Sequence, residues 1–352
     1  MRQREIDSFF HPLYHTSIFR GGEDIMGKSF FVIDGSSYIF RAFYAIRELS
    51  NTAGLPTNAV YGFTRMLQKM IKEKSPDYLA IAFDAKGPTF RHERYEQYKA
   101  QRPPMPDPLA RQIPYIHQMV AAFRIPILQE QGLEADDLIG TLAQKGAAAG
   151  LEVVIVSGDK DMYQLITPKI TLYDSMKDRL HTEASIQEKF GIAPNQIVDM
   201  MGLMGDAVDN IPGVAGVGQK TAVQLIQTFG SIENLFSRLD EVKKPKLREK
   251  LEAGAETARL SRELATIKTD CALDFDLKTF EARPPDEARL LALCQELEFY
   301  NLFKELAPAP KTPAFSYEMI DATELSSLIS EIKKEGAVAL RLLSSDANVM
   351  DA

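Results

Sequence analysis

The sequence has few cysteines, no long apolar run and no excess of positive charge. Only Cys271 and Cys294 occur among its 352 residues, too few for a disulfide framework or a multi-cysteine zinc site. We therefore expect a reducing, cytoplasmic setting. No apolar stretch is long enough to cross a membrane. The net charge of −8 means that any binding of nucleic acid needs a local basic region.

What is present is an ordinary globular composition, with 45% hydrophobic and 26% charged residues, and a length that indicates two or three domains. Residues 1–25 lack the apolar core of a signal peptide. We expect them to be a non-native or disordered extension, with translation starting at Met26, because Gly21-Gly22-Glu23 can be encoded by a purine-rich ribosome-binding sequence. A natural disordered tail is the alternative.

Carboxylates gather where predicted strands end. Asp34 follows the apolar run 30–33, Asp84 follows 78–83, and Asp159 and Asp161 follow 153–156. Strand–helix–strand units bring the carboxyl ends of parallel strands to one edge of a sheet. Three further acids, Glu134, Asp136 and Asp137, open a predicted helix. Such a cluster repels itself unless a hard cation such as Mg²⁺ binds it. The alternative is a set of helix caps and turn-forming residues.

Basic residues gather in two places. The segment 86–102 carries five basic and two acidic residues with Phe90, Tyr95 and Tyr98 between them, a pattern typical of contact with single-stranded nucleic acid. A solvated helix with long aliphatic stems is the alternative. The second run, 243–250, is predicted to be a solvated helix face, with contact to a duplex as its alternative.

A second acid pair, Asp206 and Asp209, precedes a glycine-rich turn and a predicted helix. Glycines let a backbone approach a phosphate, and the start of a helix supplies free N–H groups. The run 212–222 resembles a helix–hairpin–helix motif that binds DNA. Its candidate contact residues are Gly213, Gly216, Gly218, Lys220 and Thr221.

Seven motifs then occur in a fixed order: Asp34-Gly-Ser-Ser-Tyr, Phe83-Asp-Ala-Lys, Thr89-Phe-Arg91, Tyr98-Lys-Ala-Gln-Arg102-Pro, Glu134-Ala-Asp-Asp137, Gly158-Asp-Lys-Asp-Met-Tyr-Gln-Leu165, and Gly205-Asp through Gly213. Together they resemble the 5′-nuclease domain of bacterial DNA polymerase I, within the flap endonuclease family. The resemblance runs from about Lys28 to Leu306. It implies a parallel-sheet α/β core of the PIN-like 5′-nuclease type with a helical arch, followed by a helical helix–hairpin–helix subdomain.

The resemblance also implies a site. One metal site is expected from Asp34, Asp84, Glu134, Asp136 and Asp137, and a second from Asp159, Asp161, Asp206 and Asp209. Lys99 and Arg102 are expected to act on the scissile phosphate, Tyr98 to stack on a base, and Arg91 to contact DNA. Two Mg²⁺ ions are expected as cofactors, with Mn²⁺ as a substitute, and K⁺ is expected at the hairpin.

The expected domains are a core at 28–200 with its arch at 86–112, a helical subdomain at 201–306, and a proline-rich linker at 307–314. Residues 315–352 resemble the truncated start of a 3′-5′ exonuclease domain, with a helix at 322–335 and a strand at 337–340. Arg341 and Leu343 stand where that domain carries its Asp-x-Glu pair, so we expect it to be inactive.

The expected function is that of a monomeric 5′-3′ exonuclease and 5′ flap endonuclease. Its substrates would be flapped, nicked or branched DNA and RNA–DNA primers, in primer removal and repair, with no polymerase activity in this chain. A DNA-structure binder without catalysis and a PIN-type ribonuclease are the alternatives.

Overall fold

The computed structural model describes residues 27–306 and 325–335. The chain divides into two units, Met1–Leu306 and Ala307–Ala352. In the second unit the described residues form one helix, α15 (Leu325–Glu335), where a helix is predicted. The expected extension at 1–25, the linker at 307–314, the strand at 337–340 and the pair at 341 and 343 lie outside the described residues.

The core of the first unit is a six-stranded sheet in the order β3-β2-β1-β4-β5-β6. All neighbours are parallel except β5 and β6. The strands are β1 (Ser29–Asp34), β2 (Tyr78–Ala82), β3 (Ile127–Leu128), β4 (Glu152–Val156), β5 (Ile170–Asp174) and β6 (Arg179–His181). The expected parallel α/β sheet is therefore confirmed, with an antiparallel strand added at one edge.

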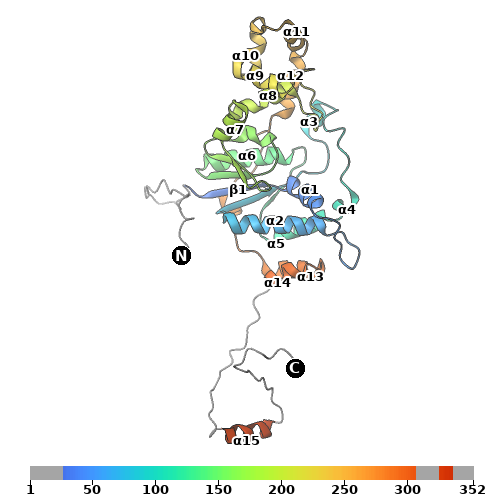
Figure 1. Cartoon of the computed structure of the whole chain (residues 1–352), viewed down its shortest axis with the longest axis vertical. Helices are drawn as coiled ribbons and strands as arrows, with labels where there is room; N and C mark the ends of the chain where they lie inside the picture. The colour runs from blue at the N-terminus through green and yellow to red at the C-terminus, as the bar shows by residue number, and fades with distance from the viewer. Residues whose placement is uncertain (1–26, 307–324, 336–352) are drawn as a thin grey trace, which may run out of the picture. The chain divides into compact units, whose positions relative to one another are not determined.

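Helices cover both faces of this sheet, which is why its central strand is an unbroken apolar run. In β1, Phe30 and Val32 belong to one buried cluster and Phe31 and Ile33 to the other. One face is covered by α6 (Ala135–Ala148) and the other by α1 (Gly35–Ala45), α2 (Asn58–Lys74) and α5 (Ile113–Ala122), as Figure 1 shows.

The expected helical arch is mostly non-helical. Only two short helices interrupt the segment 86–112, α3 (Phe90–Arg94) and α4 (Asp107–Ala110). Turns and bends occupy most of the stretch between them.

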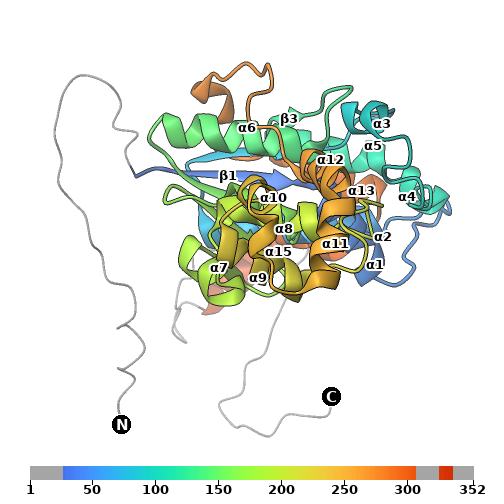
Figure 2. The same cartoon turned by 90° about the horizontal axis from the view of Figure 1, so that it is seen from above.

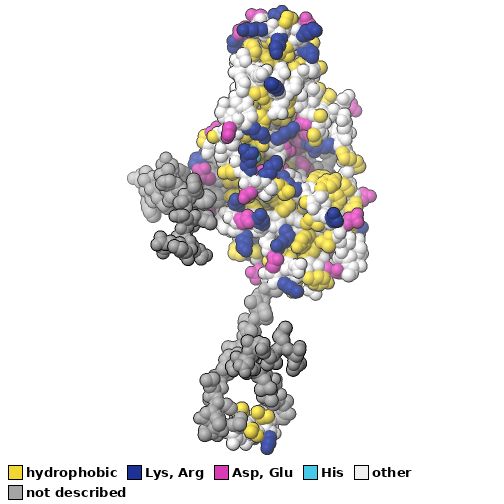
Figure 3. Space-filling view, viewed as in Figure 1, with side chains coloured by type: hydrophobic (Ala, Val, Ile, Leu, Met, Phe, Trp, Pro, Cys, Tyr) yellow, Lys and Arg dark blue, Asp and Glu magenta, His cyan; other side chains and the backbone are white. Residues whose placement is uncertain are grey.

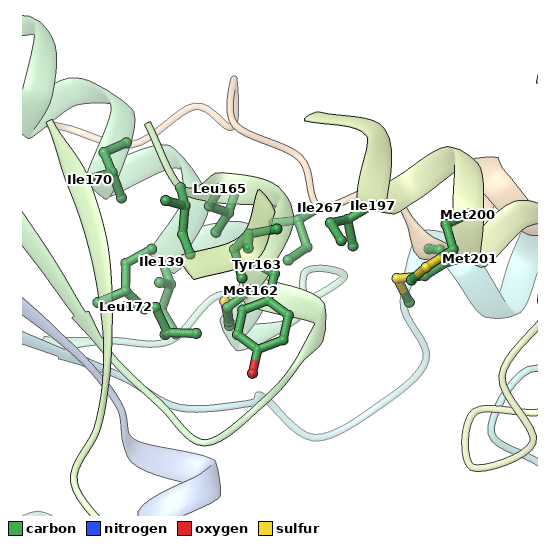
Figure 4. Close-up of a cluster of buried hydrophobic side chains, with 14 of the residues drawn as sticks. Ile139, Met162, Tyr163, Leu165, Ile170, Leu172, Ile197, Met200, Met201 and Ile267 are labelled. Atoms are coloured by element: carbon green, nitrogen blue, oxygen red, sulfur yellow. The ribbon is translucent and has the colours of Figure 1, made fainter. Parts of the chain in front are cut away.

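A group of short helices follows the sheet. It comprises α7 (Glu183–Phe190), α8 (Ile197–Met204), α9 (Gln219–Phe229), α10 (Ile232–Ser237), α11 (Pro245–Ala253) and α12 (Ala255–Ala265). Seen from above, α8 to α12 lie over the sheet (Figure 2). Buried side chains run without a break from the sheet through the 3₁₀ turn Asp161–Leu165 to α8, with Leu172, Met162 and Met201 in one cluster (Figure 4). We call α8 to α12 the helical subdomain.

The last helices of the first unit return to the core. Leu290 and Leu293 of α13 (Glu287–Glu296) and Leu302 of α14 (Tyr300–Leu306) are buried with the side chains of α2 and α5. The expected subdomain boundary at 306 is therefore corrected, because the helical subdomain ends with α12. No described helix is long and apolar enough to cross a membrane.

Candidate active site

The carboxyl ends of β1 and β2 supply the first two acids. Asp34 ends β1 and caps α1, where its Oδ1 accepts from the Ser37 N–H at 2.8 Å. Its Oδ2 accepts from the Ser157 hydroxyl at 2.7 Å. Asp84 follows β2, and its Oδ1 accepts from the Ala135 N–H at 2.9 Å. The end of β2 is thereby attached to the start of α6.

The start of α6 adds Glu134, which caps the helix, and Asp136 in its first turn. Burial raises the pKa of Asp136 well above its usual range, and the negative charges of Asp34, Asp159 and Asp84 raise it further. Burial likewise raises the pKa of Asp34 to about 6, with Asp84 and Asp159 contributing. These two shifts have a physical cause in common, since burial disfavours the charged form of both carboxylates and the charges of neighbouring acids add to the effect.

The second group contains Asp159 and Asp161 after β4 and the pair Asp206 and Asp209 after α8. Burial and the charge of Asp159 raise the pKa of Asp161 to about 7. The Oδ1 atom of Asp161 is buried and has no hydrogen-bond partner among the described residues. Burial alone would raise the pKa of Asp206 as well. The Lys160 ammonium, whose Nζ lies 2.7 Å from Asp206 Oδ2, instead holds the pKa of that carboxyl below its usual range.

Eight carboxylates therefore gather at this end of the sheet. We call them the carboxylate edge: Asp34, Asp84, Glu134, Asp136, Asp159, Asp161, Asp206 and Asp209.

Two basic residues of the arch segment lie directly on this edge. The Lys99 ammonium is 2.8 Å from Glu134 Oε2 and 3.7 Å from Asp209 Oδ2. The Arg102 guanidinium pairs with Asp209 Oδ1. The backbone also holds Lys99 at this edge. Lys99 has a left-handed φ of 54°, and its N–H donates to the Asp209 carbonyl at 2.9 Å. These contacts place Lys99 and Arg102 among the acids, and their expected action on a scissile phosphate stays a prediction.

The place of Asp137 corrects its expected role as a metal ligand. Its side chain is fully buried, and both oxygens accept from Arg91, at 2.7 and 2.8 Å. The Lys268 and Glu134 N–H groups donate to it as well, at 2.9 and 3.2 Å. A carboxylate with four donors has no free oxygen to offer a cation. We therefore leave Asp137 out of the carboxylate edge.

Arg91 and Tyr98 were expected to contact DNA, and this expectation is corrected because both side chains are buried and bonded within the protein. Arg91 is 2% exposed, and besides Asp137 it donates to the carbonyls of Leu264 and Thr266. Tyr98 is 3% exposed, with its hydroxyl 3.1 Å from Glu134 Oε2. Neither side chain reaches the surface where a nucleic acid would lie.

The glycine-rich turn between α8 and α9 is only partly accessible. Gly213 is buried, and its N–H donates to the Ser261 hydroxyl at 2.9 Å, so its expected contact with DNA is corrected. Gly216, Gly218 and Lys220 are exposed, and Thr221 is half-buried. We call residues 213–218 the hairpin.

Sequence reasoning missed two partners of the acids. Ser157 donates to Asp34 and accepts from the Asp159 N–H at 3.0 Å, which joins two acids through one hydroxyl. Lys160 neutralises Asp206. Their positions in the sequence could have indicated these contacts. Ser157 directly follows the apolar run of β4, and Lys160 stands between two aspartates.

Divalent cations fit this donor set. Within residues 27–306 and 325–335, no three potential ligands are arranged as a ready-made metal site. Lys99, Arg102 and Lys160 form ion pairs with members of the edge instead. Even so, the set consists of carboxylates, the pKa values of Asp34 and Asp161 are raised, and one Asp161 oxygen has no partner among the described residues. Such a set has the hard-oxygen chemistry that Mg²⁺ prefers.

Comparisons with known proteins cover the whole of this site. The family model for the 5′-3′ exonuclease N-terminal resolvase-like domain matches residues 29–191, and that for the 5′-3′ exonuclease C-terminal SAM fold matches 192–288. DNA polymerase I of Bacillus caldotenax is 42% identical over 285 residues, which cover 80% of this chain and 32% of that protein. The 5′-3′ exonuclease of Aquifex aeolicus is 40% identical over 279 residues, 79% of this chain and 95% of that protein.

Solved structures share the fold. The T5 5′-exonuclease with bound zinc has a TM-score of 0.59 at 22% identity, covering 80% of this chain and all of that one. The catalytic core of Rad2 with DNA substrate has a TM-score of 0.55 at 18% identity, covering 80% and 92%. The chain spans about a third of the length of its polymerase relatives. With a resolvase-like core, a helical second domain and a relative matched over nearly its full length, this chain belongs to the 5′-3′ exonuclease family.

Proposed function

We propose that this chain hydrolyses phosphodiester bonds of DNA at 5′ flaps, nicks and branched junctions, with two Mg²⁺ ions that Mn²⁺ can replace. The observation that carries the proposal is the carboxylate edge itself. Eight carboxylates from separate segments lie at one end of a parallel sheet, and burial together with the charges of neighbouring acids raises the pKa values of three of them, Asp34, Asp136 and Asp161. An arrangement that costs folding free energy is retained where function requires it.

Two groups of acids are proposed to hold the cations: Asp34, Asp84, Glu134 and Asp136 in one, and Asp159, Asp161, Asp206 and Asp209 in the other. When bound, the cations would lower the pKa of an attacking water and offset charge on the phosphate. The protein's own part is to hold these oxygens in place. Ser157 and the Ala135 N–H position Asp34 and Asp84 for this.

Positive charge for the phosphate is proposed to come from Lys99 and Arg102. Both lie at the carboxylate edge, and neither is bound on all sides, since their side chains are 19% and 47% exposed. A phosphate at this edge would meet an ammonium and a guanidinium as negative charge develops on its oxygens. The two side chains are fixed by Glu134 and Asp209 and therefore need little rearrangement.

The hairpin is proposed to hold the duplex part of the substrate by its backbone, with K⁺ as a further ligand there. Gly216 and Gly218 of the hairpin and Lys220 in the first turn of α9 are exposed. Such groups suit contact with phosphates, which carries no information on base sequence. Solved structures of the same fold contain a T5 flap endonuclease with DNA and metal ions, and Rad2 with DNA substrate. These likenesses support DNA as the substrate class. Primer removal and repair would be the cellular uses.

A panel of labelled substrates tests the proposal. The purified chain is incubated with a 5′-labelled flap duplex, a blunt duplex, a single strand and an RNA flap, in Mg²⁺ and in chelator. We expect cleavage near the flap junction, in Mg²⁺ alone. Equal cleavage of all four substrates would contradict selectivity for structure, and preferred cleavage of the RNA flap would favour a ribonuclease.

A further inference from the structure

An apolar hollow of about 240 Å³ lies at the end of the sheet away from the carboxylate edge. Its lining comes from the last turns of α2, the start of β2, the residues after α5, the segment 281–285 and the end of α14. The buried side chains of Leu79, Phe123 and Ile125 form its apolar walls.

The hollow and the carboxylate edge lie at opposite ends of the strands. Leu79 is the second residue of β2, and the Ala282 N–H donates at 2.9 Å to the carbonyl of Asp77, the residue before that strand. Asp84 instead follows the carboxyl end of β2. The five residues of β2 span about 17 Å, so a short segment bound in the hollow would leave the carboxylate edge uncovered.

The rim of the hollow is positively charged. It carries three exposed cations, which we call the rim cations: Lys72, Arg124 and Arg283. One exposed carboxylate, Glu281, lines it too. Within the described ranges 27–306 and 325–335, none of these four residues forms an ion pair. Arg283 donates to the neutral Lys278 carbonyl at 3.2 Å, which leaves its charge uncompensated. The lining therefore has a net positive charge.

Elsewhere on α2 the cations are paired. Lys69 Nζ lies 3.8 Å from Glu73 Oε1, and Lys74 Nζ lies 3.9 Å from Asp178 Oδ1. On the face that Figure 3 shows, lysine and arginine side chains below the helical subdomain likewise lie beside acidic ones. Such interleaving of both signs is typical of a solvated surface. Three unpaired cations around one apolar hollow are a different arrangement.

The position of Arg124 is one that glycine usually occupies. Arg124 follows α5, its φ of 57° lies in the left-handed region, and its N–H donates to the Ala121 carbonyl at 3.0 Å. Helices commonly end on a left-handed glycine, which adopts this conformation without strain. Strain at a residue with a long charged side chain points to a use for that side chain. Between Phe123 and Ile125, Arg124 places its charge at the rim of the hollow.

The size of the hollow limits what it can hold. Pockets for drug-sized ligands usually enclose about 300–1,000 Å³, so about 240 Å³ suits an apolar side chain better than a nucleotide or a cofactor. Apolar side chains that fill pockets anchor protein interfaces, and charges around them steer the partner. A symmetric contact with a second copy of this chain would bring two positive rims together.

We propose that the hollow docks an acidic segment of a partner protein, with one apolar side chain of that segment in the hollow and its carboxylates beside the rim cations. The apolar walls and the net positive charge of the lining determine this choice of partner. The proposal is independent of the nuclease function, since it uses no residue of the carboxylate edge or the hairpin. The partner and DNA would occupy opposite ends of the sheet.

A synthetic peptide tests the docking. The probe is a short fluorescent peptide in which aspartates flank one phenylalanine, and anisotropy follows its binding in chelator. We expect saturable binding that weakens as salt rises from about 50 to 200 mM, because exposed charges are screened. Replacing the aspartates by lysines should abolish binding. Replacing the phenylalanine by alanine should weaken it about 10-fold or more.

Variants of the rim locate the peptide. Arg124→Gly should weaken binding about 2- to 5-fold, the usual range for one exposed ion pair. Its melting temperature should stay the same or rise, because glycine adopts a φ of 57° without strain. The double variant Arg124→Gly/Arg283→Ala should weaken binding about 10-fold. The matched control is Lys69→Ala, which removes an exposed lysine of α2 outside the hollow and should bind as the wild type does.

Four outcomes overturn the proposal. Wild-type affinity in the double variant would mean that the rim cations do not hold the peptide, and an equal loss in Lys69→Ala would mean attraction to positive charge in general. Displacement of the peptide by flap DNA would place it on the DNA-binding surface. A wild type that sediments as a dimer, beside a monomeric double variant, would make a second copy of this chain the occupant.

Discussion

Arg91 and Asp137 form a two-point ion pair that is closed to solvent, with Nη1–Oδ2 and Nη2–Oδ1 distances of 2.7 and 2.8 Å. Through it three segments meet: the arch segment, the start of α6, and the end of α12 with the connection that follows it. The last of these adds the Leu264 and Thr266 carbonyls and the Lys268 N–H. Asp136, the preceding residue, faces the other acids instead. Neighbouring aspartates of one helical turn therefore have opposite electrostatic surroundings.

This contrast predicts opposite effects on stability. Asp137→Asn leaves a buried guanidinium without its counter-charge, so it should lower the free energy of unfolding by about 3–5 kcal/mol. Asp136→Asn removes one charge from a self-repelling cluster, so it should raise the melting temperature in chelator. Thermal melts of both variants beside the wild type measure this. An increase for Asp137→Asn would return that residue to the repulsive cluster.

Stability without metal should depend on pH. The pKa values of Asp34 and Asp161 are about 6 and about 7 in the folded protein, above the 3.8 of an unperturbed aspartate. The folded state thus binds these protons more tightly than the unfolded state does, and stability falls as pH rises from about 4 to about 7. In chelator, the melting temperature should decrease from pH 5 to about pH 8.

Added Mg²⁺ should reduce that decrease, because a cation replaces the protons that the carboxylates lose. The variant Asp161→Asn provides the control, since it lacks one of the two titrating groups and should show a shallower dependence in chelator. A melting temperature that rises over this pH range in chelator would mean that the acids do not repel one another.

Lys99→Ala should reduce the rate of flap cleavage at saturating DNA by about 100-fold, the usual cost of one donor to a developing oxyanion. Its effect on flap binding should be small, because the hairpin is unchanged. Single-turnover kinetics and anisotropy titrations separate the two quantities. If binding weakens as much as cleavage slows, Lys99 holds the substrate in its ground state and has no special role in the reaction.

A variant of Tyr98 distinguishes a buried structural role of this side chain from stacking on a DNA base. The hydroxyl of Tyr98 donates to Glu134, so Tyr98→Phe should cost about 1–3 kcal/mol of stability and leave the affinity for flap DNA unchanged. Chemical denaturation and flap titrations measure the two effects. Weaker DNA binding at unchanged stability would restore the expected stacking role.

The elements around the site could be predicted from sequence because their signals are local. Unbroken apolar runs followed by Asp34, Asp84 and Asp159 determine both a buried parallel strand and an acid at its end. Glu134 and Asp136 were placed at the start of a predicted helix, and the structure has them at the start of α6. Lys99 and Arg102 were identified by resemblance; the structure places them at the carboxylate edge, and their action on a phosphate stays a prediction.

The burial of Arg91, Tyr98 and Asp137 could not be predicted, because their partners are distant in sequence. Arg91 bonds to carbonyls at 264 and 266, and Tyr98 approaches Asp209 at 3.4 Å. A basic and aromatic segment has the same sequence whether its side chains point to solvent or inward. The packing of α13 and α14 against α2 and α5 is non-local too, because these helices are distant in sequence.

Flap cleavage as a function of Mg²⁺ concentration shows whether the carboxylate edge acts by holding divalent cations. Wild type and Asp136→Asn are compared at equal flap occupancy. We expect no cleavage by the wild type in chelator, a rate that rises with the square of the Mg²⁺ concentration when that concentration is low, and a variant that binds the flap but scarcely cuts it. Cleavage in chelator, or cleavage by Asp136→Asn at the wild-type rate, would contradict this role of the carboxylate edge.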